Sequence, residues 1–266
     1  MSEFIGTKLT MNLGERSYDI IIKSGSLENL YQFARLDRRV AVVTDSGVPA
    51  QYAQRVADQC KDARIITVPQ GEASKSFKIL ESVLRQMLDF GMGRDDLVVA
   101  VGGGVVGDLA GFAASIYMRG IDFINCPTTT LSMIDSSIGG KTAVDLGDTK
   151  NIVGAFWQPK LVIVDPDTLS TLPRRHYING LAEAVKASLL ADPELFAIFE
   201  KGDIDAQIGE IICRSLRFKK GIVEQDETEQ GMRKALNFGH TIGHGIEAVK
   251  GIKGRRTVGL FHGECV

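Results

Sequence analysis

Short runs of β-branched and other apolar residues recur through the first part of the chain, separated by segments with helical periodicity. The runs are apolar on both faces, which is typical of strands covered on both sides in a parallel sheet. Alternation of such strands with helices predicts repeated βαβ units, and hence an α/β domain with a doubly wound, Rossmann-like parallel sheet. The predicted strands cover residues 38–45, 63–69, 96–104, 121–127 and 160–166, with helices over 74–92 and 105–120 and a flanking hairpin within 8–25.

The strand pattern stops after residue 172, and the remaining sequence has helical patterns throughout. We therefore predict two domains, an α/β domain over residues 1–172 and an all-α domain over residues 173–266. The sequence ends at "FHGECV" without a helix end, a capping residue or a polar tail. We expect the helical domain to be incomplete for this reason.

The composition favours a globular protein with a small-molecule partner. The 31 basic and 33 acidic residues nearly cancel and are interspersed, so no field favours nucleic acid or an anionic membrane surface. The four cysteines are widely spaced and form no C-x-x-C pair, which is typical of reduced thiols in the cytoplasm. The sequence shows no signal-peptide pattern and no apolar run of the roughly 18 residues that a membrane span requires.

The stretch "GGGVVG" follows a predicted strand, opens a predicted helix and fits the dinucleotide-binding pattern G-x-G-x-x-G through Gly102, Gly104 and Gly107. Glycines let the backbone approach a pyrophosphate, and a helix N-terminus offers unpaired N–H groups to its charge. A tight turn that packs helix on sheet needs the same glycines. The pattern alone leaves both interpretations open.

Three acidic residues are candidates to bind a ribose. Open α/β sheets bind ligands outside the carboxyl ends of their strands, which favours Asp45 and Glu72. Asp122 has the usual spacing from the glycines but begins a strand, so we expect it to be solvated there. Each acid alone is also compatible with a role in a turn or a helix cap.

The stretch "SSIGGKTAV" resembles a phosphate-binding Walker A loop, but the position of its first glycine is occupied by Asp135. We therefore reject an NTPase. What remains is a set of glycine-rich turns presenting Lys141, Lys150 and Asn151. These side chains are either solvated or clamp a phosphate or carboxylate.

A polar stripe follows the helix predicted over residues 231–249. At about 100° per residue, one narrow sector holds Arg233, Asn237, His240, His244 and Glu247. The opposite, core-facing sector holds Ala235, Phe238, Ile242, Ile246 and Val249. Three glycines lie beside the stripe, each costing about 1 kcal/mol against alanine, which indicates close approach of a ligand or another backbone. Two surface histidines on an ordinary helix are the alternative.

A second predicted helix, within "GLAEAVKASLLAD", places Glu183 and Lys186 three residues apart on an otherwise apolar surface. Alone, this spacing is typical of a surface ion pair. Beside the histidines, the same pair is a candidate metal-binding carboxylate next to an ammonium that meets an anionic substrate.

Several motifs, in order, resemble those of the 3-dehydroquinate synthases: "GGGVVGDLAGFAAS", "PTTTLSMIDSSIGGKTAV", "KNIVGAFWQP", "GLAEAVK", "LNFGHTIGH" and "FHGE". The resemblance runs from about residue 15 to the end of the sequence. It implies an NAD-binding α/β domain, a helical metal-binding domain and an active site between them, in a homodimer. It also implies the shikimate-pathway enzyme that converts 3-deoxy-D-arabino-heptulosonate 7-phosphate to 3-dehydroquinate and phosphate.

The resemblance assigns roles residue by residue. Implied NAD contacts are Asp45, Glu72, Lys75, Gly104, Val105, Asp108, Thr128, Thr129, Asp135, Lys150 and Thr171. Implied ligands of zinc, or alternatively cobalt, are Glu183, His240 and His262. Implied contacts to the sugar phosphate are Arg119, Lys141, Asn151, Lys186, Lys219, Arg233, Asn237 and His244. One Glu and two His leave a zinc coordination position open, as in catalytic sites.

The implied chemistry is transient oxidation by NAD, elimination of phosphate, re-reduction and intramolecular aldol closure. Two departures affect it. Gly47 stands where family members often have a small polar residue, which affects an adenosine contact, and family members continue well beyond "FHGE". We expect a marginal or inactive chain unless other packing is supplied. The alternatives are a sister sugar-phosphate cyclase, a metal-dependent polyol dehydrogenase and an inactive NAD-binding fragment.

Overall fold

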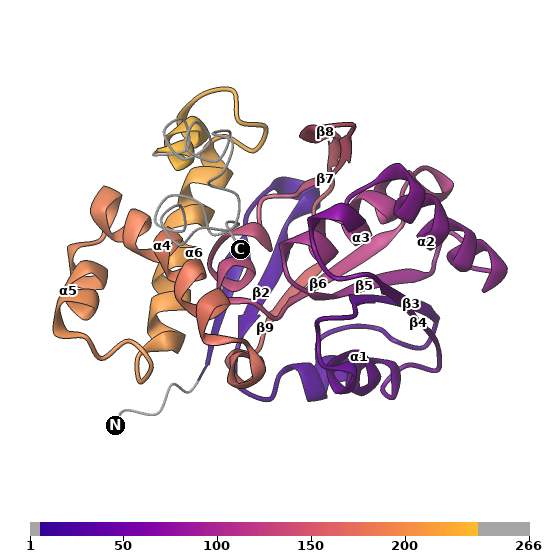
Figure 1. Ribbon diagram of the computed structural model, residues 1–266, viewed down its shortest axis with the longest axis horizontal. Helices are drawn as coiled ribbons and strands as arrows, with labels where there is room; N and C mark the ends of the chain where they lie inside the picture. Colours follow the sequence, from indigo (N-terminus) through magenta and orange to yellow (C-terminus); the bar gives the residue numbers. More distant parts are fainter. Residues whose placement is uncertain (1–5, 239–266) are drawn as a thin grey trace.

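A seven-stranded sheet forms the centre of the computed structural model, which describes residues 6–238 (Figure 1). Its strands are β1 (Thr7–Met11), β2 (Tyr18–Ile22), β3 (Arg39–Asp45), β4 (Asp62–Val68), β5 (Leu97–Gly102), β6 (Asp122–Pro127) and β9 (Leu161–Val164). The order across the sheet is β1-β2-β9-β6-β5-β3-β4, with β1 antiparallel to β2 and all other neighbours parallel. The predicted doubly wound sheet and its flanking hairpin are confirmed.

Helices cover both faces of this sheet. Helices α2 (Phe77–Asp89) and α3 (Gly104–Ile116) pack on one face, while α1 (Ala50–Ala57) and the 3₁₀ segment η2 (Leu27–Gln32) pack on the other. Every residue of β5 is buried, because this strand lies in the interior of the sheet between two helical layers. The short segments η1 (Gly14–Arg16), η3 (Glu72–Ser74) and η4 (Tyr117–Arg119) complete this part.

A two-stranded antiparallel hairpin, β7 (Lys141–Leu146) and β8 (Thr149–Phe156), packs against α3 outside the main sheet. Thr142 and Val144 point inward, and a Cβ on Gly111 of α3 would lie 2.5 Å from Thr142 Cγ2, so the hairpin approaches the helix at a glycine. The predicted glycine turn before Lys141 is confirmed by the positive φ of Gly139 and Gly140, but Lys141, Lys150 and Asn151 belong to strands, so their placement in loops is wrong.

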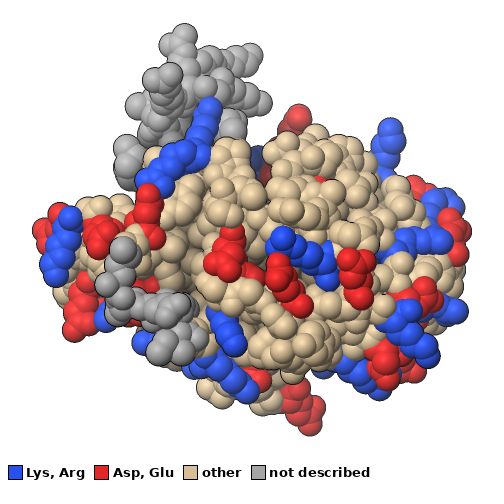
Figure 2. Space-filling model, turned by 90° about the horizontal axis from the view of Figure 1, so that it is seen from below, with Lys and Arg blue, Asp and Glu red and all other residues tan. Residues whose placement is uncertain are grey.

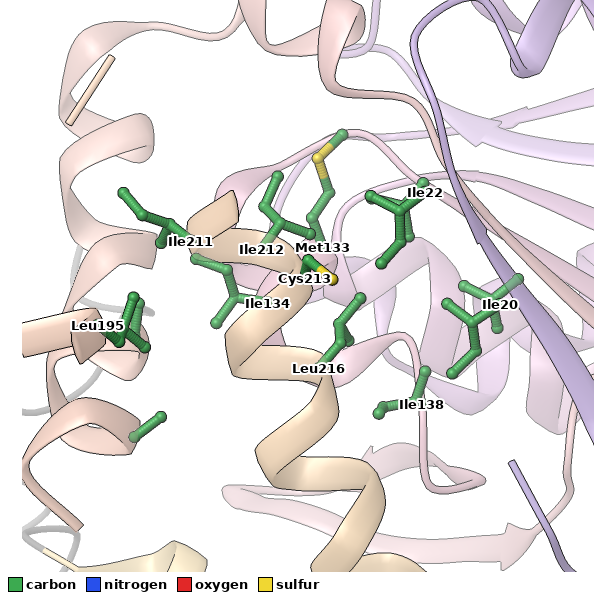
Figure 3. Packing of buried hydrophobic residues seen from close by; sticks show 14 of the residues in the cluster. Ile20, Ile22, Met133, Ile134, Ile138, Leu195, Ile211, Ile212, Cys213 and Leu216 are labelled. Carbon is green, nitrogen blue, oxygen red and sulfur yellow. The ribbon is translucent and has the colours of Figure 1, made fainter. Parts of the chain in front are cut away.

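Helices alone follow Pro173 in the part of the chain that the structure describes: α4 (Arg174–Ala191), α5 (Pro193–Lys201), α6 (Ile208–Gln225) and the 3₁₀ segment η7 (Met232–Asn237). They pack against β1, β2, β9, the 3₁₀ segment η6 (Pro166–Thr171) and the π-helical segment η5 (Ser132–Ser136). Figure 3 shows Ile20 and Ile22 of β2 facing Leu216 of α6 in this core. The apolar packing is continuous across residue 172, and the domain division there stays a prediction.

The helix predicted over residues 231–249 is wrong in its described part. Residues 232–237 form a 3₁₀ helix, in which positions four apart diverge by about 120° and no longer share a face. Arg233 is buried, whereas Ala235 and Phe238, expected in the core, are exposed. The Asp226 carboxylate accepts the backbone N–H groups of residues 230, 231 and 233, which turns the chain sharply before η7.

Acidic and basic side chains are mixed on the face shown in Figure 2, and no large area of one sign forms there. Within residues 6–238, no helix combines the length and the apolar character that crossing a bilayer requires.

Candidate active site

A cavity of about 600 Å³ opens at the carboxyl ends of the parallel strands. Loops after β3, β4, β5 and β6 form one wall, and the start of α4 forms the other. Parallel strands end at the same edge of a sheet, so residues far apart in sequence meet here. The predicted NAD contacts that line this cavity are Asp45, Glu72, Lys75, Gly104, Val105, Asp108, Thr128, Thr129, Asp135 and Thr171, together with the predicted metal ligand Glu183.

The N-terminus of α3 supplies the backbone of this cavity. Gly103 precedes the helix without a side-chain cap, and Gly103, Gly104 and Val105 all line the cavity. A Cβ on Gly104 would lie 3.1 Å from Ser136 Oγ, a buried hydroxyl with no hydrogen-bond partner among the described residues. Uncapped N–H groups beside an unsatisfied hydroxyl fit a phosphate of a dinucleotide.

The two interpretations of the glycine pattern apply to different glycines. A Cβ on Gly102 would lie 2.6 Å from Val106 Cγ2, so this glycine serves the packing of α3 on β5. Gly107 similarly faces Asn125 of β6, with 3.1 Å from its virtual Cβ to Nδ2. Gly104 instead faces the cavity.

Asp45 ends β3 with its carboxylate inside the cavity wall. Its Oδ1 accepts the N–H groups of Gly47 at 2.7 Å and Val48 at 3.2 Å. Burial raises the pKa of Asp45 despite these two donors. A Cβ on Gly47 would lie 2.2 Å from the Gln70 amide carbon, so the Gln70 side chain fills the space beside this glycine.

Lys75 ties three loops together at the opposite side of the cavity. Only 2% exposed, it places Nζ 2.7 Å from Asp108 Oδ2 and 3.7 Å from Glu72 Oε1, and it also contacts Asn151 Oδ1. Asn151 is thereby brought to the cavity from β8. Lys150, its neighbour on β8, is exposed and does not line the cavity.

Four charged side chains, here called the ion cluster, lie between η5, α4 and α6: Asp135, Glu183, Lys186 and Lys219. Lys219 Nζ lies 2.8 Å from Asp135 Oδ1 and donates at 2.8 Å to the Asp135 carbonyl. Lys186 pairs with Glu183 and donates at 2.6 Å to the Leu236 carbonyl. Glu183 is 9% exposed, so the alternative of a surface ion pair is wrong.

Burial and neighbouring charges shift the pKa values of three members of the ion cluster. Burial raises the pKa of Glu183, and the nearby Asp135 carboxylate adds to this rise. Burial also lowers the pKa of Lys219. Burial acts against ionisation of Asp135 as well, but Lys219 and Lys186 outweigh it and hold the Asp135 pKa below its usual range.

The remaining predicted substrate contacts do not line the cavity. Lys141 pairs with the Glu229 carboxylate, and Asn237 Nδ2 donates to the same carboxylate at 2.9 Å. Arg233 is 2% exposed and donates at 3.0 Å to the Gly139 carbonyl. Arg119 lies beyond the far end of α3, roughly 20 Å from the glycine turn by helix rise.

Two predicted metal ligands, His240 and His262, and the predicted substrate contact His244 lie outside the described residues. The structure adds four residues that the sequence interpretation missed: Tyr52, Gln70 and His176 in the cavity wall, and Glu229 beside Lys141. His176 had a readable signal, because it lies seven positions before Glu183 and therefore within about 20° of it on α4.

The family models for the N-terminal and C-terminal parts of 3-dehydroquinate synthase match residues 65–179 and 180–266. The chain belongs to the 3-dehydroquinate synthase family. The 3-dehydroquinate synthase of Pelobacter propionicus is 43% identical over 97% of this chain and 74% of its own length. The 3-dehydroquinate synthase of Caulobacter vibrioides is 45% identical over 96% of this chain and 72% of its own length. The predicted family and its enzyme class, a lyase, are confirmed.

Solved structures with the same fold include sugar-phosphate cyclases. A 2-deoxy-scyllo-inosose synthase complexed with carbaglucose-6-phosphate, NAD+ and Co2+ aligns with a TM-score of 0.86 and 28% identity over 95% of this chain and 73% of that one. A 2-epi-5-epi-valiolone synthase from Streptomyces hygroscopicus with NAD+ and Zn2+ bound aligns with a TM-score of 0.78 and 31% identity, over 87% of this chain and 68% of that one. A probable glycerol dehydrogenase from Sinorhizobium meliloti aligns with a TM-score of 0.60 over 90% of this chain and 71% of that one. At 16% identity, this similarity shows the shared fold alone.

Proposed function

We propose that this member of the 3-dehydroquinate synthase family converts 3-deoxy-D-arabino-heptulosonate 7-phosphate to 3-dehydroquinate and phosphate, with NAD and a divalent metal. The observation that carries this proposal is the gathering in one cavity of Glu183 and every predicted NAD contact except Lys150. A cytoplasmic homodimer is part of the same proposal.

The cavity fits a dinucleotide at each of its chemical parts. The N-terminus of α3 would bind the pyrophosphate, and Asp45 at the end of β3 would accept hydrogen bonds from ribose hydroxyls. Lys75 and Asp108 hold each other in the wall beside Glu72, so that this part of the cavity keeps its shape. Bound NAD supplies a reversible hydride acceptor, and a bound metal polarises a substrate hydroxyl.

Residues around the ion cluster handle the substrate. Glu183 would hold the metal together with His240 and His262, and the metal would take the place of Lys186, its present ion-pair partner. Lys186 then donates to an anionic group of the substrate. Lys219 keeps Asp135 ionised at the junction of cavity and helices. The remaining proposed contacts are Arg119, Lys141, Asn151, Arg233, Asn237 and His244.

The test incubates the chain with substrate, NAD and zinc, and follows phosphate, 3-dehydroquinate and NADH together. We expect phosphate and 3-dehydroquinate in equal amounts with no accumulation of NADH, because the conversion involves no net redox change. Accumulating NADH would identify a dehydrogenase. A hexose phosphate serves as the control substrate, and its turnover in place of the heptulosonate would identify a sister cyclase. Binding of NAD without turnover or a zinc site would identify an NAD-binding fragment.

A further inference from the structure

Two of the proposed substrate contacts, Arg233 and Lys141, depend on one glycine turn. Gly139 and Gly140 have positive φ angles of 94° and 70°, and Lys141 follows them as the first residue of β7. Arg233 Nη2 donates at 3.0 Å to the Gly139 carbonyl, and a Cβ on Gly139 would lie 2.5 Å from the same nitrogen. Only glycine leaves room for the guanidinium at this point. The place of Arg233 and the start of β7 are therefore set together.

The Arg233 guanidinium is a buried cation whose hydrogen-bond partners are neutral. It donates to the main-chain carbonyls of Gly139 and Glu227, and it lies 5.8 Å from the centre of the Phe156 ring. Burial lowers the pKa of Arg233, although nearby carboxylates, that of Glu229 first, act against this shift. A buried charge that binds only neutral carbonyls is suited to an anionic ligand group.

Tyr18 of β2 holds the glycine turn from the side of the sheet. Its side chain is 3% exposed, and the phenol oxygen accepts the Gly139 N–H at 3.2 Å. Gly139 is thereby bound at both of its polar groups, by Tyr18 at the N–H and by Arg233 at the carbonyl. Ile138, the residue before the turn, lies in the same core as Ile20 of β2 (Figure 3). The sheet thus fixes the turn on which Arg233 rests.

Tyr18 does not act as the counter-ion of Arg233. Burial raises the pKa of Tyr18 far above its ordinary value, and the Gly139 N–H and the Arg233 charge offset only part of this rise. The phenol therefore keeps its proton at neutral pH. Its contribution to the turn is a hydrogen-bond acceptor for a buried N–H group.

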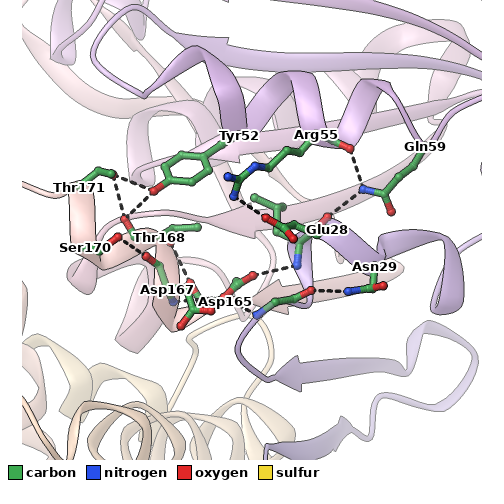
Figure 4. Close-up of polar contacts among 12 residues, drawn as sticks. Glu28, Asn29, Tyr52, Arg55, Gln59, Asp165, Asp167, Thr168, Ser170 and Thr171 are labelled. Atoms are coloured by element: carbon green, nitrogen blue, oxygen red, sulfur yellow. Dashed lines mark hydrogen bonds and ion pairs between the residues drawn. The ribbon is translucent and has the colours of Figure 1, made fainter.

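Two other buried tyrosines have partners outside this turn. The phenol oxygen of Tyr52, in the wall of the cofactor cavity, lies 2.9 Å from Thr171 Oγ1 (Figure 4). Tyr177 of α4 is 7% exposed, belongs to the same core as Tyr18 and forms a hydrogen bond with the Asp205 side chain. Tyr18 differs from both, because its partner residue also binds a proposed substrate contact.

Resting on the proposed function, we infer that Tyr18 is a positioning residue for an anionic group of the substrate. Through Gly139, it holds Arg233 and the strand that begins at Lys141 in their binding positions. Without the phenol oxygen, the buried Gly139 N–H loses its acceptor. A glycine rotates toward another acceptor at little cost. The Gly139 carbonyl then turns away from Arg233, and the start of β7 moves with it.

The test measures the dissociation constant of inorganic phosphate by calorimetry with the 266-residue chain, and the KM of the heptulosonate phosphate at saturating NAD and zinc. Tyr18→Phe should raise both at least about fivefold, since a buried N–H loses its acceptor. The value of kcat and the dissociation constant of NAD should stay within about twofold, because the lost interaction serves substrate binding. Unchanged phosphate binding and KM would overturn the inference, and so would an equal loss of NAD binding.

The outcomes separate the inference from the proposed function. Phosphate binding that weakens in Tyr18→Phe, in a chain without turnover, would refute the proposed function alone. A wild-type chain that turns over the substrate but gives the same constants as Tyr18→Phe would overturn the inference alone. A wild-type chain that neither binds phosphate nor turns over would refute both.

A double-mutant cycle tests whether Tyr18 acts through Arg233. Arg233→Lys keeps the charge but loses the fork of donors that reaches two carbonyls. If the effect of Tyr18 passes through Arg233, adding Tyr18→Phe to Arg233→Lys should weaken phosphate binding by less than about twofold more. A further loss as large as that of Tyr18→Phe alone would overturn the positioning role.

Tyr177→Phe is the matched control, because it removes a phenol of similar burial from the same core. Thermal unfolding should show similar losses in the two variants, whereas phosphate binding should weaken in Tyr18→Phe alone. Equal weakening in both would overturn the inference. If Tyr18→Phe does not fold, Gly139→Ala decides, because its methyl group displaces the guanidinium. A folded Gly139→Ala protein with wild-type phosphate binding would overturn the inference.

Discussion

The cavity and the ion cluster meet at Asp135 and Glu183, yet their polar groups are arranged in opposite ways. In the cavity, the N-terminus of α3, the Asp45 carboxylate, Tyr52 and Thr171 surround an open volume. In the ion cluster, the lysines already bind the protein's own carboxylates and carbonyl groups. Sheet topology thus preforms the proposed cofactor half, whereas in the ion cluster, the proposed substrate half, we expect the charges to exchange partners when an anionic ligand binds.

The largest expected effect tests whether the ion cluster depends on mutual pairing. Lys219→Met leaves Asp135 without its ammonium partner. We expect the free energy of unfolding to fall by about 3 kcal/mol, the lower end for buried pairs, because the Asp135 side chain keeps 32% exposure. Urea unfolding at neutral pH measures this loss.

Lys220→Met is the matched control, one residue along the same helix. Lys220 pairs with Glu224 at 2.8 Å, and Glu224 also accepts hydrogen bonds from Asn12, so its carboxylate keeps a partner and this variant should lose no more than about 1 kcal/mol. Equal losses in the two variants would mean that the ion cluster depends on its pairing no more than the Lys220–Glu224 pair does.

The second prediction tests whether the N-terminus of α3 in the cavity binds the cofactor. Gly104→Asp adds a carboxylate at the N-terminus of α3, where the proposed pyrophosphate binds. We expect the dissociation constant of NAD to rise about a hundredfold, because like charges placed together cost several kcal/mol. Stability should hold or rise slightly, since an acidic residue in the first turn favours a helix. Gly221→Asp in α6, where a Cβ meets nothing within 4 Å, should leave NAD binding unchanged. Unchanged NAD binding in Gly104→Asp would place the pyrophosphate elsewhere.

Features that depend on a local sequence pattern are predicted from the sequence, whereas features that depend on contacts between distant residues are not. The main strands carry apolar residues on both faces, a local signal that places them within a few residues. The hairpin β7–β8 has Thr142 and Val144 against α3, whereas most residues of β8 are exposed, and its sequence pattern resembles that of a loop. Its position depends on a contact with Gly111 that lies far away in the sequence.

The same distinction between local motifs and distant contacts holds for the residues of the candidate site. The glycine turn and the strand-end acids are local motifs, and the structure brings them together. Arg233 is different: its burial depends on the Gly139 carbonyl and on the Asp226 turn, which no periodicity of η7 encodes. Tyr52 was missed because its partner Thr171 is 119 positions away. Only the tertiary structure places that tyrosine in the cavity wall.

A smaller effect is expected at a partly exposed ion pair among the same helices. Asp192 precedes α5, accepts the Leu195 N–H at 3.0 Å and pairs with Arg214 at 3.1 Å. Asp192→Asn keeps a helix-capping side chain but loses the charge, so we expect a loss of about 0.5–1 kcal/mol at neutral pH. Glu194→Gln, at a partner of Arg214 that is 79% exposed, should lose less.

The pH dependence of that loss has a definite sign. Burial opposes ionisation of Asp192, but the Leu195 N–H and Arg214 outweigh it and lower the Asp192 pKa. A depressed carboxyl pKa stabilises the fold above the unfolded-state pKa, and the contribution disappears as pH falls through the folded value. The difference between wild type and Asp192→Asn should therefore vanish in acid, below the ordinary aspartate range. A difference that persists there would assign the loss to packing.

The smallest expected effect concerns Glu229, whose carboxylate binds both Lys141 and Asn237. Burial opposes its ionisation, but these two partners lower the Glu229 pKa, so it is charged at neutral pH and competes with a substrate anion. Glu229→Gln should lower KM by about two- to fivefold, the worth of a partly exposed pair, without changing the dissociation constant of NAD. Glu224→Gln, which alters the pair with Lys220 in the last turn of α6, is the control and should leave KM unchanged. A raised KM in Glu229→Gln would show that Glu229 holds Lys141 and Asn237 in their binding positions, and the substrate half would then be preformed like the cofactor half.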